Sequence, residues 1–239
     1  DSSLTNLVSN IGVVATDTTG VGTARVSLAA AGYGGDKAIF GYGFNFPNNL
    51  SITNLVSNTG VVATNTSGVG TARYNLAAAG YGGDKAIFGY GFIAPNESSL
   101  TNLVSNIGVV ATDTTGVGTA RDGLAAAGYG VDKAIFGYGY DSIGVTSVTN
   151  KVSNQGVVAT DTSGVGTTRY LLAAAGYGYD KAIFGYGLNN ANVDVSITNL
   201  VSNTGVVATD TTGVGTARDY LAAAGYGGDK AIFGYGYVS

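Results

Sequence analysis

The charged side chains that could do chemistry in this chain recur at a fixed spacing of 48 or 49 residues. One recurring position holds arginine, at Arg25, Arg73, Arg121, Arg169 and Arg218. The chain contains no His and no Cys. That removes the commonest general base, the commonest transition-metal ligand and all thiolate chemistry. Serines are plentiful, but no histidine exists to activate one. These residue types argue against an enzyme, and we expect no catalytic residue.

The acidic residues could serve acid–base catalysis or calcium binding, but their setting favours neither. Asp17 and Asp36 stand beside Thr, Gly and Lys, where turn capping is the preferred interpretation. One carboxylate per turn falls short of the roughly six to eight oxygens that calcium takes, and Asn65 replaces the Asp in one copy. Asp precedes Lys37, whereas a phosphate-binding loop requires Gly-Lys followed by Ser or Thr. We therefore expect no metal and no cofactor.

Composition narrows the class of protein further. The 239 residues include 11 basic and 15 acidic side chains, for a net charge of −4, which is too acidic for nucleic-acid binding through counterion release. No run of 18 apolar residues is present, so no membrane-spanning helix is expected. The 40 Gly and 2 Pro stay below the roughly 25–30% of Gly plus Pro that marks disorder. We therefore expect a folded chain in which Gly marks turns and tight packing.

An internal repeat must position these charges. The string Ala-Ile-Phe-Gly-Tyr-Gly begins at 38, 86, 134, 182 and 231, and Thr-Asn pairs keep the same period. Each unit predicts four short strands. In the first copy these are Ser3–Asn10, Val13–Thr16, the alanine run after Leu28, and Lys37–Gly43. Gly follows the Ala triplet within one residue, so a strand is favoured over a marginal helix.

Repeats of roughly 40–50 residues with four strands each are typical of propeller blades. We predict an all-β, five-bladed β-propeller with four antiparallel strands per blade, forming a single domain over 1–239. Small Ala and Gly side chains would allow the inner strands to approach one another at the axis, and Tyr and Phe would fill the wider outer wedge. The predicted blades cover approximately 21–65, 69–113, 117–161, 165–210, and 214–237 together with 1–17.

The order of motifs resembles a kelch repeat. A strand with Phe-Gly-Tyr-Gly is followed by Thr-Asn-Leu-Val, then by Val-Val, and then by an Arg that opens the next inner strand. The match covers all five copies but departs from the family pattern, because Tyr42 splits the glycine pair and the family's Trp is absent. The resemblance implies a divergent kelch-like propeller. Arrays of Lys-Ala-Ile-Phe-Gly-Tyr-Gly are also similar to repeats of phage virion and tail proteins.

The kelch alignment implies a specific closure. It designates the Arg-led alanine strand as a, the Phe-Gly-Tyr-Gly strand as b, the Thr-Asn strand as c and the Val-Val strand as d. The chain then begins with c and d and ends with a and b, so the last blade must join Arg218–Tyr237 to Ser3–Asp17. Pairing the N-terminal strands with the C-terminal strands would remove the open sheet edges.

The recurring arginines then have two interpretations. In the preferred one, they form a structural ring, in which each guanidinium ties neighbouring blades together through carbonyl groups and a carboxylate such as Asp17 or Asp36. Arginine suits this role because its planar fork makes several fixed hydrogen bonds. In the alternative, arginines placed near a common axis would form a positive ring that binds an anion.

Positions at which the copies differ indicate a candidate binding surface. Such positions follow each arginine, in the d–a connection, and fill the b–c loops. In an up-and-down blade the d–a and b–c connections emerge at the same end. This face carries aromatic and amide side chains at Phe44, Phe46, Asn48, Tyr74, Phe92, Asn96, Tyr140, Tyr170 and Tyr220. Such side chains suit sugar rings or a protein partner; neutral drift of loops is the alternative. One position in the a–b turn also varies: Gly35, Gly83, Val131, Tyr179 or Gly228.

Two functions follow from this reasoning. The first is a non-catalytic structural or adhesive propeller on a virion (a phage tail or capsid surface) or outside a cell, which contacts a partner through its variable face and belongs to a larger assembly. The alternative is a lectin with up to one shallow glycan site per blade, gaining strength through multivalency. The expected partner is a protein or a glycan and not a nucleic acid. The expected location is the virion surface or extracellular, with a cytoplasmic location left open.

Overall fold

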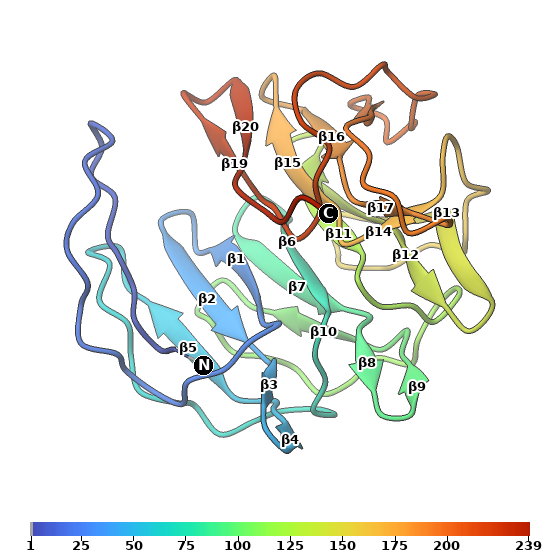
Figure 1. Ribbon diagram of the computed structural model, residues 1–239. Coiled ribbons are helices and arrows are strands. Elements are labelled where there is room, and N and C mark those ends of the chain that lie inside the picture. The colour runs from blue at the N-terminus through green and yellow to red at the C-terminus, as the bar shows by residue number, and fades with distance from the viewer. Residues whose placement is uncertain (1) are drawn as a thin grey trace.

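A computed structural model describes residues 2–239, and within them the chain is all-β. Asp1, which the predicted fifth blade includes, lies outside the described residues. Residues 2–239 contain no helix, and so none that could cross a membrane. The strands form separate small antiparallel sheets, one after another along the chain (Figure 1). The predicted all-β class and the antiparallel pairing are thereby confirmed.

Each repeat centres on one hairpin with a third strand added to it. In the first repeat, β1 (Ala29–Tyr33) pairs with β2 (Lys37–Gly41), and β2 pairs with β5 (Thr53–Val56). The equivalent strands in later repeats are β6 (Ala77–Tyr81), β7 (Lys85–Gly89) and β10 (Thr101–Val104); β11 (Ala125–Tyr129), β12 (Lys133–Asp141) and β13 (Gly144–Val152); β15 (Ala173–Tyr177), β16 (Lys181–Gly185) and β18 (Thr198–Val201); and β19 (Ala222–Tyr226) and β20 (Lys230–Gly234).

Pairs of very short strands lie beside these sheets. They are β3 (Phe44–Asn45) with β4 (Asn48–Asn49), β8 (Phe92–Ile93) with β9 (Asn96–Glu97), and β14 (Arg169–Tyr170) with β17 (Leu188–Asn189). In the third repeat β12 and β13 are long enough to continue across this region, with a register shift between Gly137 and Gly139. The short pairs hold the b–c loops, which carry much of the predicted variable surface.

The fourth strand of each repeat is less regular than predicted. In the first repeat it is held to β5 by two isolated bridges, Thr53 to Thr66 and Val56 to Val62. The bridged residues on β5, Thr53 and Val56, are three positions apart in sequence, whereas their partners on the outer segment, Val62 and Thr66, are four positions apart. The extra residue is a β-bulge, which interrupts the ladder. The predicted four-stranded blade is therefore three regular strands plus a bulged outer segment, and the same spacing recurs in the second, third and fourth repeats.

Successive inner strands lie side by side, in the order β1, β6, β11, β15 and β19. Small residues permit this approach, because a Cβ on Gly80 would stand 3.6 Å from the carbonyl oxygen of Gly32 in the preceding repeat. The apolar core lies between sheets. One cluster joins Ile39 and Tyr42 of the first repeat to Phe88 and Val104 of the second, and two similar clusters follow.

The predicted pairing of N-terminal with C-terminal strands is not formed in residues 2–239. Strand β20 pairs with β19 alone, and the N-terminal segment folds on itself through bridges Thr5 to Thr18 and Val8 to Val14. Figure 1 shows this N-terminal hairpin, in dark blue, apart from β19 and β20, in red. The hairpin packs instead on the first repeat, where Leu7 lies close to Gly60. The last sheet consequently has two strands.

Candidate binding surfaces

The recurring arginines lie between sheets, and Arg121 illustrates their geometry. Its side chain is fully buried, with Nε donating to the Tyr138 carbonyl at 2.9 Å and Nη1 to the Thr119 carbonyl at 3.0 Å. Nη2 donates to Asn150 Oδ1 at 2.6 Å. The guanidinium also stacks 4.2 Å from the ring centroid of Tyr90, in the preceding repeat. One arginine therefore joins β12, β13 and the segment just before it, and contacts the neighbouring repeat through an aromatic ring.

The other arginines make all or part of this set. Arg73 makes the same three hydrogen bonds as Arg121 and stacks on Tyr42. Arg169 bonds Thr167 and Asn199 and stacks on Tyr138. The end positions differ: Arg25 bonds Thr23 and Asn54 but is stacked on no tyrosine within residues 2–239, and Arg218 bonds Thr216 alone. Because Nε, Nη1 and Nη2 of both Arg73 and Arg121 donate to protein acceptors away from solvent, the geometry favours the structural interpretation over anion capture.

The carboxylates near the arginines act mainly as hydrogen-bond acceptors for the chain. Asp113 accepts from the Thr71 backbone N–H at 2.9 Å and from its hydroxyl at 2.7 Å, and from Asn102 Nδ2 at 2.9 Å. Its nearest oxygen stands 3.9 Å from Arg73 Nη1. Burial tends to raise the pKa of Asp113, but the hydrogen bonds from Thr71 and Asn102, with Arg73 nearby, bring it below its usual value.

Asn65 occupies the equivalent place in the first repeat and keeps the same contacts with a neutral side chain. Its Oδ1 accepts from the Thr23 backbone N–H at 3.2 Å, and its Nδ2 donates to the Thr23 hydroxyl at 2.8 Å. An amide can therefore replace the carboxylate, which agrees with turn capping. Asp36, the other carboxylate considered from sequence, pairs with adjacent Lys37 at 3.0 Å rather than with an arginine.

The structure brings the two variable regions together at one end of each repeat. The residue after each arginine forms an antiparallel bridge with the first residue after the Gly-Tyr-Gly motif. The bridged pairs are Val26 with Phe44, Tyr74 with Phe92, Asp122 with Tyr140, Tyr170 with Leu188, and Asp219 with Tyr237. Side chains that are distant in sequence therefore share one surface.

Aromatic rings form a continuous row across the first two repeats. Ring centroids lie 6.3 Å apart for Phe46 and Phe44, 5.2 Å for Phe44 and Tyr74, and 5.5 Å for Tyr74 and Phe92. These four residues are called the aromatic row below. Phe46 is 83% exposed at its end, and the other three are half-buried. The row therefore offers flat apolar surface to solvent on a backbone fixed by bridges.

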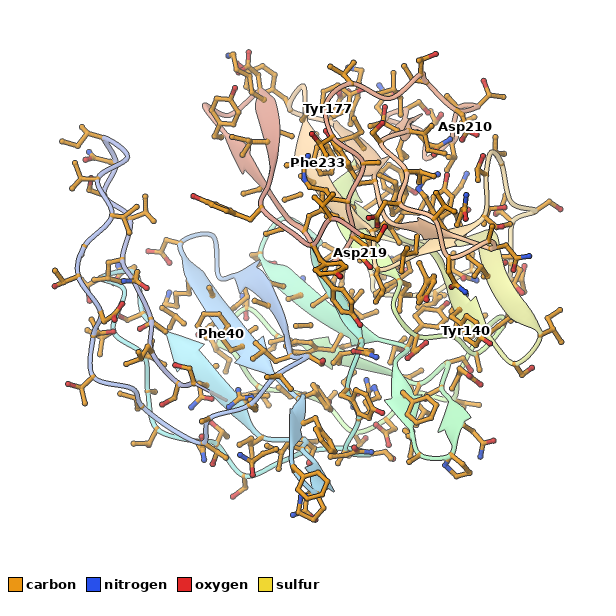
Figure 2. The ribbon with its side chains drawn as sticks, in the orientation of Figure 1. Phe40, Tyr140, Tyr177, Asp210, Asp219 and Phe233 are labelled. Atoms are coloured by element: carbon orange, nitrogen blue, oxygen red, sulfur yellow. The ribbon has the colours of Figure 1, made fainter. Side chains whose placement is uncertain are left out.

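The remaining predicted site residues are distributed around this surface. The ring centroids of Tyr140, in the third repeat, and Tyr170, in the fourth, lie 5.8 Å apart. Tyr140 is labelled in Figure 2. Asn48 and Asn96 are exposed, on β4 and β9. Tyr220 is 66% exposed and joins no aromatic pair within residues 2–239. The predicted site is therefore two stacked groups and single residues rather than one cleft.

Two acidic residues on this face were not among the predicted site residues. Asp122 and Asp219 follow their arginines, and burial raises the pKa of each carboxyl above its usual value. Asn75 Nδ2 donates to Asp122 Oδ2 at 3.1 Å, which opposes that rise. The signal available from sequence was their place at the variable position next to Arg, which aromatic residues occupy in two other repeats.

Comparison with protein-family models and with curated proteins finds no match to this chain.

Proposed function

We propose that this chain is a non-catalytic binding module whose stacked sheets form a rigid support and whose variable face contacts a protein partner. The observation that carries the proposal is the aromatic row, because it gathers residues of the least repeated segments into one exposed surface. Aromatic side chains supply large contact area at little entropic cost, and they dominate many protein interfaces. The resemblance to phage virion and tail repeats supports a place on a virion or another extracellular structure.

The second candidate is a lectin. Exposed Phe46 lies in the same b–c loop as exposed Asn48, and a flat ring beside an amide can hold one face and one hydroxyl of a sugar. Each of the first four repeats has its own b–c loop, so the arrangement would present up to one shallow site on each of them. Weak single sites would then add through multivalent attachment.

Crosslinking from the aromatic row tests the first function. A photoreactive residue would replace Phe46 on the surface, and Val157, which is 64% exposed on a c–d turn, would carry the same residue as the matched control. We expect a specific protein crosslink from position 46 and none from position 157 in the native assembly. Equal crosslinking, or none from position 46, would contradict the proposal. Saturable binding to a glycan array that Phe46→Ser abolishes would favour the lectin instead.

We also propose that the array closes into the five-bladed propeller, with blades at about 21–65, 69–113, 117–161, 165–210, and 214–237 with 1–17. Unmatched groups at the two ends support this closure. In the interior repeats the Asn side chain on strand c accepts from the arginine, as Asn102 does from Arg73 at 2.7 Å. Within residues 2–239, Asn6 accepts no hydrogen bond from an arginine, and Arg218 donates none to a strand-c Asn. Closure would place Arg218 where it can donate to Asn6.

The interface between repeats leaves a second unmatched set. Tyr42 is fully buried, against Phe88 at 5.2 Å and under Arg73 at 4.4 Å. Its equivalent in the last repeat, Tyr235, is 94% exposed. On the first repeat, Phe40 and Arg25 are the equivalents of Phe88 and Arg73, and within residues 2–239 they line the side that no other repeat covers. They are the residues that Tyr235 would contact in a closed ring. Figure 2 shows Phe40 on the first sheet, apart from β20 and its Phe233.

A hollow marks the space that the last hairpin would fill. It measures about 350 Å³ and is lined by residues of the N-terminal hairpin and the first repeat, among them Asn6, Arg25 and Phe40. The N-terminal hairpin already packs on the first repeat as the outer strands of other repeats do: Leu7 approaches Gly60 as Leu55 approaches Gly108. The N-terminal hairpin is therefore already seated on the first repeat as the proposed closure requires.

A double-mutant cycle between Arg218→Ala and Asn6→Ala tests this closure. If the ring closes, we expect a coupling of about 0.5–3 kcal/mol in the free energy of unfolding, which is the range for residues in direct contact. If the ends stay apart, the two effects add. The matched control is the cycle between Arg121→Ala and Asn150→Ala, whose partners are bonded at 2.6 Å.

A further inference from the structure

The hairpin turns between the first two strands of each repeat lie at the end of the molecule away from the aromatic row. Each turn places two consecutive residues at positive φ, for example Gly34 at 62° and Gly35 at 79°. This geometry is typical of tight hairpins, and it strongly favours Gly. The first turn residue must be small for another reason, since a Cβ on Gly34 would stand 3.0 Å from the Asn106 carbonyl oxygen.

Two repeats carry large side chains at the second turn residue in spite of this geometry. Val131 has φ 73° and Tyr179 has φ 67°, and bulky or β-branched residues rarely adopt such angles because they are strained. Their side chains recover little by packing, since Val131 is 79% and Tyr179 77% exposed. A Cβ on Gly35 or Gly83 would likewise meet no atom within 4 Å. The strain is therefore not offset within the chain.

Val131 and Tyr179 stand at a concave surface. A hollow of about 280 Å³ is lined by both residues and by Tyr129, Tyr177 and Lys181. A second hollow of about 280 Å³ shares Val131 and Gly128 with it and extends over the earlier repeats. Each volume lies just below the range of about 300–1,000 Å³ for ligand pockets, as suits a small ligand.

Lys133 lines one hollow and Lys181 the other, and each is paired with the aspartate that precedes it. Lys133 Nζ stands 2.8 Å from Asp132 Oδ1, and Lys181 Nζ stands 3.0 Å from Asp180 Oδ1. Asp180 also accepts from Asn203 Nδ2 at 3.0 Å, which fixes its carboxylate. Because each lysine is matched by its own aspartate, the surface carries no net charge that would select an ion.

We propose that this turn surface, built around Tyr179 and Val131, binds a neutral saccharide. The Tyr179 ring would hold the apolar face of a sugar, and the Lys181–Asp180 pair would donate to and accept from adjacent hydroxyls. A neutral, hydroxyl-rich ring matches a surface that combines an exposed aromatic face with paired donors and acceptors. This site is separate from the aromatic row and does not depend on the function proposed there.

The chain itself provides a matched variant for the test. Tyr179→Gly introduces the residue that three other repeats carry at this turn position, so the variant is expected to fold and to have an equal or higher thermal midpoint. The probe is an array of neutral hexose and N-acetylhexosamine oligosaccharides, followed by titration of the strongest binder by NMR. We expect Tyr179→Gly to weaken that binding at least tenfold, and Phe46→Ser, at the aromatic row, to leave it unchanged.

Two results would overturn the proposal. One is an unaltered protein that binds no neutral saccharide on the array. The other is saccharide binding that survives Tyr179→Gly. If Phe46→Ser alone loses that binding, the sugar binds at the aromatic row. A protein crosslink from position 46 is scored separately, so that the two functions can fail independently.

Discussion

At the scale of single residues, arginine rather than lysine is required at the recurring position. Arg121 donates in three directions, and its guanidinium also lies over the Tyr90 ring. A lysine ammonium has no planar face, and its donors radiate from one atom. Burial lowers the pKa of the Arg121 guanidinium, with Tyr90 and Asp161 opposing this change, but an arginine still remains charged.

Removing one interior arginine should strongly destabilise the fold. Arg121→Ala leaves three buried acceptors without this donor. Each unsatisfied buried group costs about 1–3 kcal/mol, so we expect a loss of at least about 3 kcal/mol in the free energy of unfolding. Urea denaturation would measure it. Lys133→Ala serves as the control, because Lys133 is bonded to the neighbouring Asp132 in a half-exposed pair and should change stability little. Equal effects of the two variants would contradict the role given to Arg121.

The buried tyrosines predict a stability that falls in alkali. Burial raises the pKa of Tyr42, Tyr90 and Tyr138 to about 12, although the stacked arginines oppose this rise. The folded state therefore holds its phenolic protons more tightly than the unfolded state, whose tyrosines titrate near pH 10. Their contribution to stability is complete below pH 10 and is lost as the pH rises toward 12.

We expect the midpoint of urea unfolding to fall between pH 10 and 12. In Tyr42→Phe the midpoint should fall less steeply with pH. Tyr226→Phe, at a residue that is 52% exposed, is the control and should leave the slope as it is. A midpoint that stays constant between pH 10 and 12 would show that these phenols ionise without unfolding.

At the scale of elements, a glycine in the second strand of each of the first four repeats receives an aromatic ring from the next repeat. A Cβ on Gly137 would stand 2.7 Å from Phe184 Cζ, whereas a Cβ on Gly234, the equivalent in β20, meets no atom within 4 Å. The sheets are therefore fitted to one another at a strand position where any side chain would overlap the ring.

Gly137→Ala should destabilise the chain by about 1–3 kcal/mol, the usual cost of overpacking, as measured by thermal unfolding. Gly234→Ala is the matched variant and distinguishes the two states of the array. It should be close to neutral if β20 keeps an open face, and as costly as Gly137→Ala if Phe40 packs there in a closed ring. A neutral Gly137→Ala would contradict the packing itself.

The sequence was sufficient to predict the regular elements. The Ala-Ala-Ala-Gly-Tyr and Lys-Ala-Ile-Phe-Gly segments are paired strands as expected, because a repeated motif with Gly-rich turns leaves few other arrangements. The bulge between Val62 and Thr66 was not predicted, because alternation over so few residues does not reveal one extra residue. Among the site residues, Phe44 and Tyr74 could be assigned to one face from topology, but their stacking depends on bridge geometry that the repeat pattern does not encode.

At the scale of the whole molecule, successive repeats contact one another head to tail, through two different surfaces. The Gly34 N–H donates to the Asp84 carbonyl of the next repeat at 2.6 Å, and the Gly82 N–H donates to Asp132 at 2.7 Å. Each repeat thus presents one surface forward and a different, complementary surface backward. The first and last repeats leave one surface of each kind without a partner.

Deleting residues 2–17 tests how the last repeat is completed. In a closed ring this deletion removes the third and outer strands from β20, so the thermal midpoint should fall further than in Gly137→Ala. If the N-terminal hairpin is only an arm on the first repeat, the deletion should cost little. Deletion of a b–c loop tip, replacing 46–48 by a short turn, is the control for a loss of surface residues alone.

The directional contact between repeats has a consequence for assembly. A head-to-tail interface produces a finite ring when the rotation per unit divides the circle, and an open-ended polymer when it does not. If the five repeats close into a ring, removing the repeat at 117–161 would leave too few units to complete it while keeping both complementary end surfaces. In that case the shortened protein should grow into filaments as its concentration rises, whereas the parent chain should not.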